Sequence, residues 1–273
     1  MKVLIKCWLL LVNYFVFIVS AYGQLSTFKL EYLLADKHIF IQENCYQSCN
    51  DKILFINLHD NEQTSRIAAD SFLKINNGMI MHIINDSSRN IEFALGEKKY
   101  IVDPNRIFSK AGRLASLKLL SENTDDSAEP FVAYFAQQLI KNYVAKKSII
   151  IALHNNSDSN FSIKTYVHLQ DSIPNSGKVY VNPEMDEDDF IITSSIDIFK
   201  KIKAIKINVV WENVSKVKDD GSLSLYCSKH KIPYLNVEAQ HDHLQQQLFM
   251  LYSLKDIISS YSAKHKVRFN KKQ

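Results

Sequence analysis

The sequence has little charge imbalance, no internal repeat and no low-complexity segment. Lysine and arginine together outnumber aspartate and glutamate by four, which gives a formal net charge of +4. Removal of residues 1–23 would take away two lysines and no acidic residue, leaving +2. This near-neutral balance gives no sign of the strongly basic surface that binds nucleic acid. The remaining residues, 24–273, have the length of one large α/β domain with a substantial core.

Cysteine is also scarce, with only four residues, one of them close to the N-terminus. In an exported protein Cys45 and Cys49 could close a small disulfide loop, although the sequence does not establish that they pair. Cys227 would then remain on the apolar face of a helix. A zinc site built from these cysteines is disfavoured, because no fourth ligand can be named.

The N-terminus resembles a secretory signal peptide. Lys2 and Lys6 precede an apolar stretch from Cys7 to Val19, and small residues follow it. This order predicts a signal peptide over residues 1–23, cleaved between Gly23 and Gln24, and a secreted or periplasmic protein without stable membrane insertion. An uncleaved membrane anchor is the alternative, since a membrane-spanning helix needs about 20 apolar residues. No cysteine stands at the cleavage point, which argues against a lipoprotein.

Hydrophobic periodicity predicts strands that alternate with helices, the pattern of a mixed, largely parallel sheet covered on both faces. The fold class is therefore α/β, a three-layer sandwich. Strands are predicted at residues 28–33, 38–42, 53–58, 79–85, 89–94, 99–102, 148–153, 209–211 and 234–237. Helices are predicted at residues 65–74, 131–144, 194–202, 222–229 and 243–262.

Two of these apolar strands end in histidine. The segment ILFINLHDNEQT delivers His59 and Glu62 where the chain turns toward a helix, and SIIIALHNN ends in His154. An ordinary strand-to-helix loop with capping residues is the alternative for the first segment. The carboxyl ends of neighbouring strands meet at one edge of an α/β sheet, so the three side chains could converge. Three protein ligands with an open fourth position are typical of a catalytic zinc.

Two further segments complete a recognisable order. VDPNRIF contains Asn105 and Arg106, and IPYLNVEAQ is a strand that delivers Glu238. The order HxxE, Asn-Arg, strand ending in His and strand ending in Glu resembles the zinc carboxypeptidase superfamily. VDPNRIF and LHNN are most similar to its aspartoacylase and succinylglutamate desuccinylase branch, whereas DDGSLSLYCSKHKIPYLNVE resembles the carboxypeptidase branch. The resemblance covers residues 53–240 and implies a carboxypeptidase-like, phosphorylase/hydrolase-like fold.

The resemblance implies a role for each of these residues. His59, Glu62 and His154 would hold one zinc ion per chain, and Glu238 would be the general base. Asn105 and Arg106 would bind a substrate carboxylate, for which a planar guanidinium is well suited. Arg89 would stabilise the oxyanion, with Arg113 and Lys98 as competitors for that role. The substrate-binding tyrosine of the family's carboxypeptidases has no counterpart between Asn213 and Asp220.

These implications lead to one expected function and three alternatives. We expect an exported zinc-dependent hydrolase that removes the C-terminal residue of a peptide, because the chain ends soon after Glu238 and leaves no room for the extra β-domain of aspartoacylases. An N-acyl amino acid is the second candidate substrate. A non-catalytic protein that binds carboxylates is a rival, as is a structural domain in which the clusters are loops. His241 and His243 are interpreted as a polar loop after a strand and not as ligands.

Overall fold

The computed structural model describes residues 19–20, 25–47, 52–157 and 161–261. The predicted signal peptide, apart from Val19 and Ser20, and the predicted cleavage site lie outside these residues, so they remain predictions. No helix in the described part of the chain combines the length and the hydropathy needed to cross a membrane.

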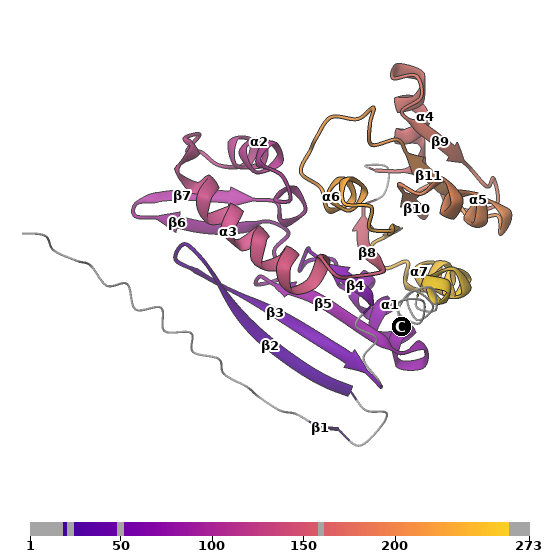
Figure 1. Cartoon of the computed structure of the whole chain (residues 1–273), viewed down its shortest axis with the longest axis horizontal. Coiled ribbons are helices and arrows are strands. Elements are labelled where there is room, and N and C mark those ends of the chain that lie inside the picture. Colours follow the sequence, from indigo (N-terminus) through magenta and orange to yellow (C-terminus); the bar gives the residue numbers. More distant parts are fainter. Residues whose placement is uncertain (1–18, 21–24, 48–51, 158–160, 262–273) are drawn as a thin grey trace, which may run out of the picture.

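A ten-stranded mixed sheet forms the middle of the molecule (Figure 1), in the order β1-β2-β3-β5-β4-β8-β12-β10-β11-β9. The central strands β5, β4, β8 and β12 are parallel to one another. The flanks are antiparallel except for the β10–β11 pair. The bounds are β1 Val19–Ser20, β2 Leu25–Leu34, β3 Lys37–Tyr46, β4 Ile53–Asn57, β5 Gly78–Ile84, β8 Ile149–Asn156, β9 Gly177–Tyr180, β10 Phe190–Thr193, β11 Val209–Glu212 and β12 Tyr234–Gln240.

Helices cover both faces of this sheet. Successive side chains of a strand point to opposite faces, so the apolar side chains of the central strands form a core on each face. In β4, Leu54 and Ile56 join one core cluster whereas Ile53 and Phe55 join another. The first core packs under α2 (Lys110–Leu120), α3 (Glu129–Leu139) and α6 (Leu223–Lys229). The second packs under α1 (Gln63–Asn76), α5 (Ile196–Ala204) and α7 (Leu244–Ser253). Every residue of β4 is therefore buried.

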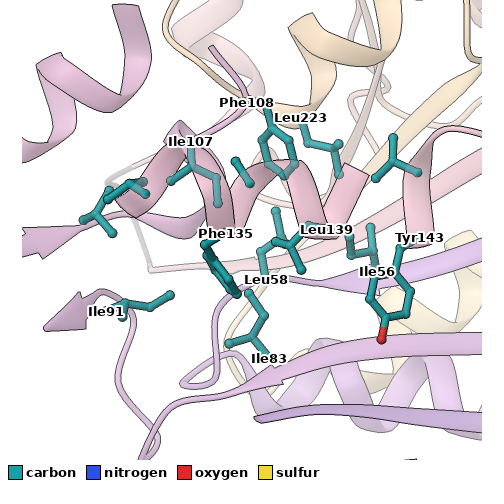
Figure 2. Packing of buried hydrophobic residues seen from close by; sticks show 14 of the residues in the cluster. Ile56, Leu58, Ile83, Ile91, Ile107, Phe108, Phe135, Leu139, Tyr143 and Leu223 are labelled. Carbon is teal, nitrogen blue, oxygen red and sulfur yellow. The ribbon is translucent and has the colours of Figure 1, made fainter. Parts of the chain in front are cut away.

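Figure 2 shows part of the first core, where Phe135 and Leu139 of α3 pack toward Ile56, Leu58 and the rest of the sheet. A small two-stranded sheet, β6 (Ile91–Leu95) with β7 (Lys98–Val102), contributes to the same core. After β7 comes the 3₁₀ helix η1 (Pro104–Arg106), which carries the Asn-Arg pair. The core therefore fixes the position of a segment that the sequence assigns to the site.

The predicted three-layer α/β architecture is confirmed, and the predicted strands and helices are present with shifted ends. The exception is the single helix predicted at residues 243–262, which a turn at Leu254 interrupts after the end of α7. The sequence prediction omitted β1, β9, β10, α2 and α4 (Ile163–Ser172). β9 and β10 are only four residues long, and α4 buries only one residue completely, Ile163. The predicted helix at residues 131–144 starts at Glu129 and ends in a π-helical turn, η3 (Ile140–Val144).

The cysteines follow the expected pattern where they are described. Cys45 is disulfide-bonded, and Cys49, its predicted partner, lies outside the described residues. Cys227 is a free thiol buried in α6, and burial raises its pKa. A buried thiol of this kind is expected to be unreactive.

Candidate metal centre

The first two candidate ligands lie between β4 and α1. His59 follows the end of β4, and Glu62 occupies the N-cap position of α1 without capping the helix through its side chain. The cap comes from Asn155 in β8, whose Oδ1 accepts a hydrogen bond from the backbone N–H of Ser65 at 2.9 Å. Glu62 therefore stands at a helix start while its carboxylate is free to turn toward the histidines.

The structure brings His59, Glu62 and His154 together as a buried group. Glu62 Oε1 lies 2.8 Å from His59 Nδ1, and Glu62 Oε2 lies 2.9 Å from His154 Nδ1. The two Nδ1 atoms are 3.2 Å apart. Two nitrogen ligands of a tetrahedral zinc, each roughly 2.0–2.1 Å from the metal, lie about 3.3 Å apart. The spacing of the donor atoms and their chemistry therefore fit a zinc ion.

Asp103 is a fourth member of the cluster that the sequence analysis did not identify. Its Oδ1 accepts a hydrogen bond from His59 Nε2 at 2.8 Å. This bond leaves Nδ1 of His59 as the atom that faces Glu62 and His154. Metal-ligating histidines commonly donate their second N–H to a carboxylate, which fixes the tautomer and raises ligand basicity. The feature of the sequence that could have identified Asp103 was its position directly after β7, in VDPNRIF.

The ionisation of these groups is strongly coupled. Burial opposes the charge of His59, but Glu62 and Asp103 outweigh it and raise the pKa of His59 to about 9. Burial likewise opposes the charge of Glu62, and the two histidines overcome it and hold the pKa of Glu62 well below its usual value. The cluster therefore keeps an ionised carboxylate in the interior, as metal binding requires. A metal ion bound there would displace the extra proton of His59, since a ligating histidine is neutral.

Glu238 lies beside this group on the neighbouring strand. β12 and β8 are parallel, and Glu238 is paired in register with His154. Register partners on adjacent strands point to the same face of a sheet, so Glu238 and His154 share one face. Glu238 is buried and accepts a hydrogen bond from Asn236 Nδ2 at 2.8 Å. Burial raises the pKa of Glu238, partly offset by His154.

The predicted substrate-binding residues have protein partners in the structure. Arg89 Nη1 donates to Glu62 Oε1 at 2.6 Å, so Arg89 reaches the metal-site carboxylate. Asn105 Oδ1 accepts a hydrogen bond from the N–H of Leu223, which holds the start of α6. Arg106 Nη1 donates to the backbone carbonyl of Asn105 and lies 3.7 Å from Asp220 Oδ2.

The two alternatives for the oxyanion role lie elsewhere. Arg113 pairs with Glu129, and Lys98 pairs with Asp125. His243 is 3.5 Å from Asp189, and His241 donates its backbone N–H to Asn156, in keeping with a polar loop before α7. In the described residues, His59, Glu62 and His154 are the only group of three that could hold a metal ion.

Comparison with known proteins shows a likeness of fold. No family model and no curated protein matches the sequence. Among solved structures, thrombin activatable fibrinolysis inhibitor is 10% identical, with 88% of this chain and 72% of that chain covered and a TM-score of 0.52. Carboxypeptidase A from Helicoverpa armigera is 11% identical over 88% and 69%, with a TM-score of 0.49. An aspartoacylase family protein from Mesorhizobium loti is 15% identical over 89% and 69%, with a TM-score of 0.47. At 10% identity the likeness to thrombin activatable fibrinolysis inhibitor is one of fold, in agreement with the predicted α/β fold class.

Proposed function

We propose that the chain is a zinc-dependent hydrolase that cleaves an amide bond next to a substrate carboxylate. The observation that carries the proposal is the convergence of His59, Glu62 and His154, with Glu238 in register on the adjacent strand. A protein that only binds carboxylates has no need of a buried glutamate beside a metal-type cluster. The same observation disfavours a structural domain in which these residues are unrelated loops.

His59, Glu62 and His154 would hold the ion, which supplies Lewis acidity: it lowers the pKa of a bound water toward 7 and polarises the scissile carbonyl. Glu238 would take the proton of the attacking water and pass it to the leaving nitrogen. Its raised pKa favours the protonated form, and a nearby divalent cation would favour the ionised form again. Asp103 would hold His59 in the ligating tautomer.

Arg106 would bind the substrate carboxylate through its guanidinium, and Asn105 would set its position. Asp220, an exposed carboxylate of the same chain, already lies close to Arg106, which supports the ability of this guanidinium to bind an acid. Arg89 would act on the reacting carbonyl from its place beside Glu62. A terminal residue of a peptide is the leading substrate, and an N-acyl amino acid shares the same two features, an amide and an adjacent carboxylate. The basic and apolar order of residues 1–19 supports export.

Metal content and hydrolysis test the proposal together. We expect about one zinc per chain by elemental analysis of the purified protein, as three convergent ligands imply, and loss of the ion in His59→Ala and His154→Ala. His230→Ala is the matched control, because His230 is exposed and far along the chain from the cluster. Glu238→Gln should keep the zinc and lose hydrolysis of peptides and N-acyl amino acids by a factor of about 10² or more.

Two results would contradict the proposal. A folded wild-type protein that binds no zinc when zinc is supplied would exclude the metal mechanism. A Glu238→Gln variant with unchanged activity would remove Glu238 from the reaction. Thermal unfolding of each variant shows whether a loss reflects the site or the fold.

A further inference from the structure

The structure contains a cavity of about 540 Å³ whose wall includes none of the candidate metal ligands. It is enclosed by α4, α6 and the segment that links β11 to α6. Most of its wall is apolar or aromatic, with Phe161, Leu169, Ile173, Val217 and Leu225 among the lining residues. A pocket of this size and character suits a substrate side chain with a long aliphatic portion.

One carboxylate stands out in this apolar wall. Glu212 is the last residue of β11, is partly buried and lines the cavity. In the described part of the chain no lysine, arginine or histidine lies within ion-pair distance of it. Desolvation, reinforced by the neighbouring charge of Asp220, raises the pKa of Glu212 to about 7. The charge of Arg106 opposes this rise only in part. A carboxylate without an ion-pair partner in an apolar wall is costly to ionise, and a cationic ligand would offset that cost.

The other ionisable groups of the cavity do not supply that cation. Tyr166 is neutral at ordinary pH, because desolvation and nearby acidic groups raise its pKa well above its usual value. Asp220 and Lys218 are exposed, and Asp220 is engaged with Arg106 at 3.7 Å. His168 on α4 also lines the cavity, and in the described residues neither it nor Lys218 forms an ion pair with Glu212. Glu212 is therefore the carboxylate in the cavity wall that can pair with a cationic ligand.

Two observations relate the cavity to the proposed reaction centre. Phe190, the register partner of Glu238 on β10, packs against Phe161 and Tyr166 with ring centroids 5.5 and 6.1 Å apart. At the rim, Asp220 contacts Arg106, the proposed carboxylate-binding residue. A substrate whose carboxylate lies on Arg106 would therefore have the cavity within reach of its side chain.

We propose that Glu212 makes this cavity a specificity pocket for a substrate residue with a cationic side chain, an amine or a guanidinium, next to the scissile amide. The aliphatic part of such a side chain would lie against the apolar wall while its charge pairs with Glu212. This inference rests on the proposed function for the orientation of the substrate. The preference for a cation rests on the pocket alone.

Binding of two free amino acids tests the inference without requiring hydrolysis. L-Lysine and L-norleucine have the same backbone and similar side-chain length, and differ in the terminal ammonium. Calorimetric titration of the full-length, zinc-supplied protein should give a Kd for lysine at least about tenfold below that for norleucine, as expected for a charge pair in a partly desolvated site. Glu212→Gln should remove this preference, whereas Glu184→Gln, at an exposed carboxylate, should keep it.

Equal binding of the two amino acids, tighter binding of norleucine, or an unchanged preference in Glu212→Gln would overturn the inference. Glutamine is the uncharged isostere of a protonated glutamate, so the variant is expected to fold, and thermal unfolding checks this. If the protein cleaves peptides, the ratio of kcat/KM for C-terminal lysine over C-terminal norleucine should fall at least about tenfold in Glu212→Gln. A protein that binds lysine selectively but hydrolyses nothing would support the pocket and contradict the proposed activity.

Discussion

His59 donates its Nε2–H to Asp103 at 2.8 Å, and this one bond determines which ring nitrogen of His59 faces Glu62 and His154. Asp103 also accepts the backbone N–H of Asn105 at 2.7 Å. The carboxylate is thus shared between the candidate metal centre and the segment that carries the Asn-Arg pair. A substitution of Asp103 should therefore affect both the candidate metal centre and the segment that carries the Asn-Arg pair.

Asp103→Asn should weaken zinc binding by about tenfold, within the 10- to 100-fold range typical of partners that orient a metal-ligating histidine. The amide keeps the shape of the side chain but removes the negative charge that supports His59. Competition with a chromogenic zinc chelator at fixed pH measures the change in Kd. Asp126→Asn, at an exposed aspartate, is the control and should not alter Kd. Unchanged zinc affinity in Asp103→Asn would show that this carboxylate does not support the ligand.

Gln247 of α7 ties together the two strands that carry His154 and Glu238. It is completely buried, and its Nε2 donates to the carbonyl oxygens of His154 and Val237 at 3.0 and 3.2 Å. Its Oε1 accepts from Asn155 Nδ2 at 3.2 Å. Gln247→Met, similar in volume, should lower the free energy of unfolding by about 2–3 kcal/mol, because several buried polar groups lose a partner. Urea unfolding measures this.

Gln246→Met gives the matched control for that change, since Gln246 is exposed on the same helix. It should alter the free energy of unfolding by less than about 0.5 kcal/mol. Equal effects of the two substitutions would mean that the buried network contributes nothing measurable to stability.

The sequence was sufficient for the parts of the site that lie on central strands. β4 and β8 are buried on both faces, so each appears as an uninterrupted apolar run, and the polar residues that end the runs are visible without a structure. The parallel arrangement of these strands then brings His59 and His154 to one edge of the sheet. Glu238 follows by the same reasoning, because β12 pairs in parallel with β8.

Residues whose roles depend on distant contacts could not be predicted in this way. Asp103 also accepts from the N–H of Asn105, so locally it looks like an ordinary turn residue. The helix α2 was omitted although Ser109 caps it, and its Gly112 shows how tertiary packing overrides local propensity. A β-carbon on Gly112 would lie 2.3 Å from the Cα of Gly221, so close approach of two segments requires glycine there. Glu212 likewise gains its raised pKa only from the cavity around it.

Gly221→Ala should destabilise the protein and disturb Arg106. Gly221 has a φ of +75°, and an added β-carbon would lie 2.4 Å from the carbonyl oxygen of Arg106. Left-handed strain and a backbone clash together should cost about 2–4 kcal/mol of unfolding free energy. If Arg106 binds the substrate carboxylate, KM should also rise.

Gly96→Ala separates the two causes. Gly96 has a similar φ of +62° but no heavy atom within 4 Å of an added β-carbon, so only the backbone strain, about 1 kcal/mol, is expected. Urea unfolding of both variants gives the difference that belongs to packing against Arg106. Equal losses of unfolding free energy in Gly221→Ala and Gly96→Ala would show that the segment around Gly221 moves away from Arg106 without a free-energy cost.

The pH dependence of stability should report the environment of Glu212. Its pKa is about 7 in the folded protein, against 4.5 for an ordinary glutamate. Below the lower value both states are protonated, so the group has no differential effect. As the pH rises toward 7 the unfolded chain loses the proton first, so the folded state becomes relatively less stable, by on the order of 1–3 kcal/mol once the group is ionised in both states. This loss is absent in Glu212→Gln.

Urea unfolding of wild type, Glu212→Gln and Glu184→Gln at about pH 5 and about pH 8 measures the difference. Asp220, Arg106, His168 and Lys218, the other charged or titratable groups near the cavity, are present in all three proteins. The difference between wild type and Glu212→Gln therefore reports the ionisation of Glu212, including its interactions with Asp220 and Arg106. Glu212→Gln should gain stability relative to wild type at the higher pH, and Glu184→Gln, at an exposed carboxylate, should follow wild type. Bound lysine at the higher pH should reduce the advantage of Glu212→Gln, because the ammonium stabilises the ionised carboxylate in wild type only. Parallel stability curves for wild type and Glu212→Gln would mean that Glu212 ionises as an ordinary surface glutamate.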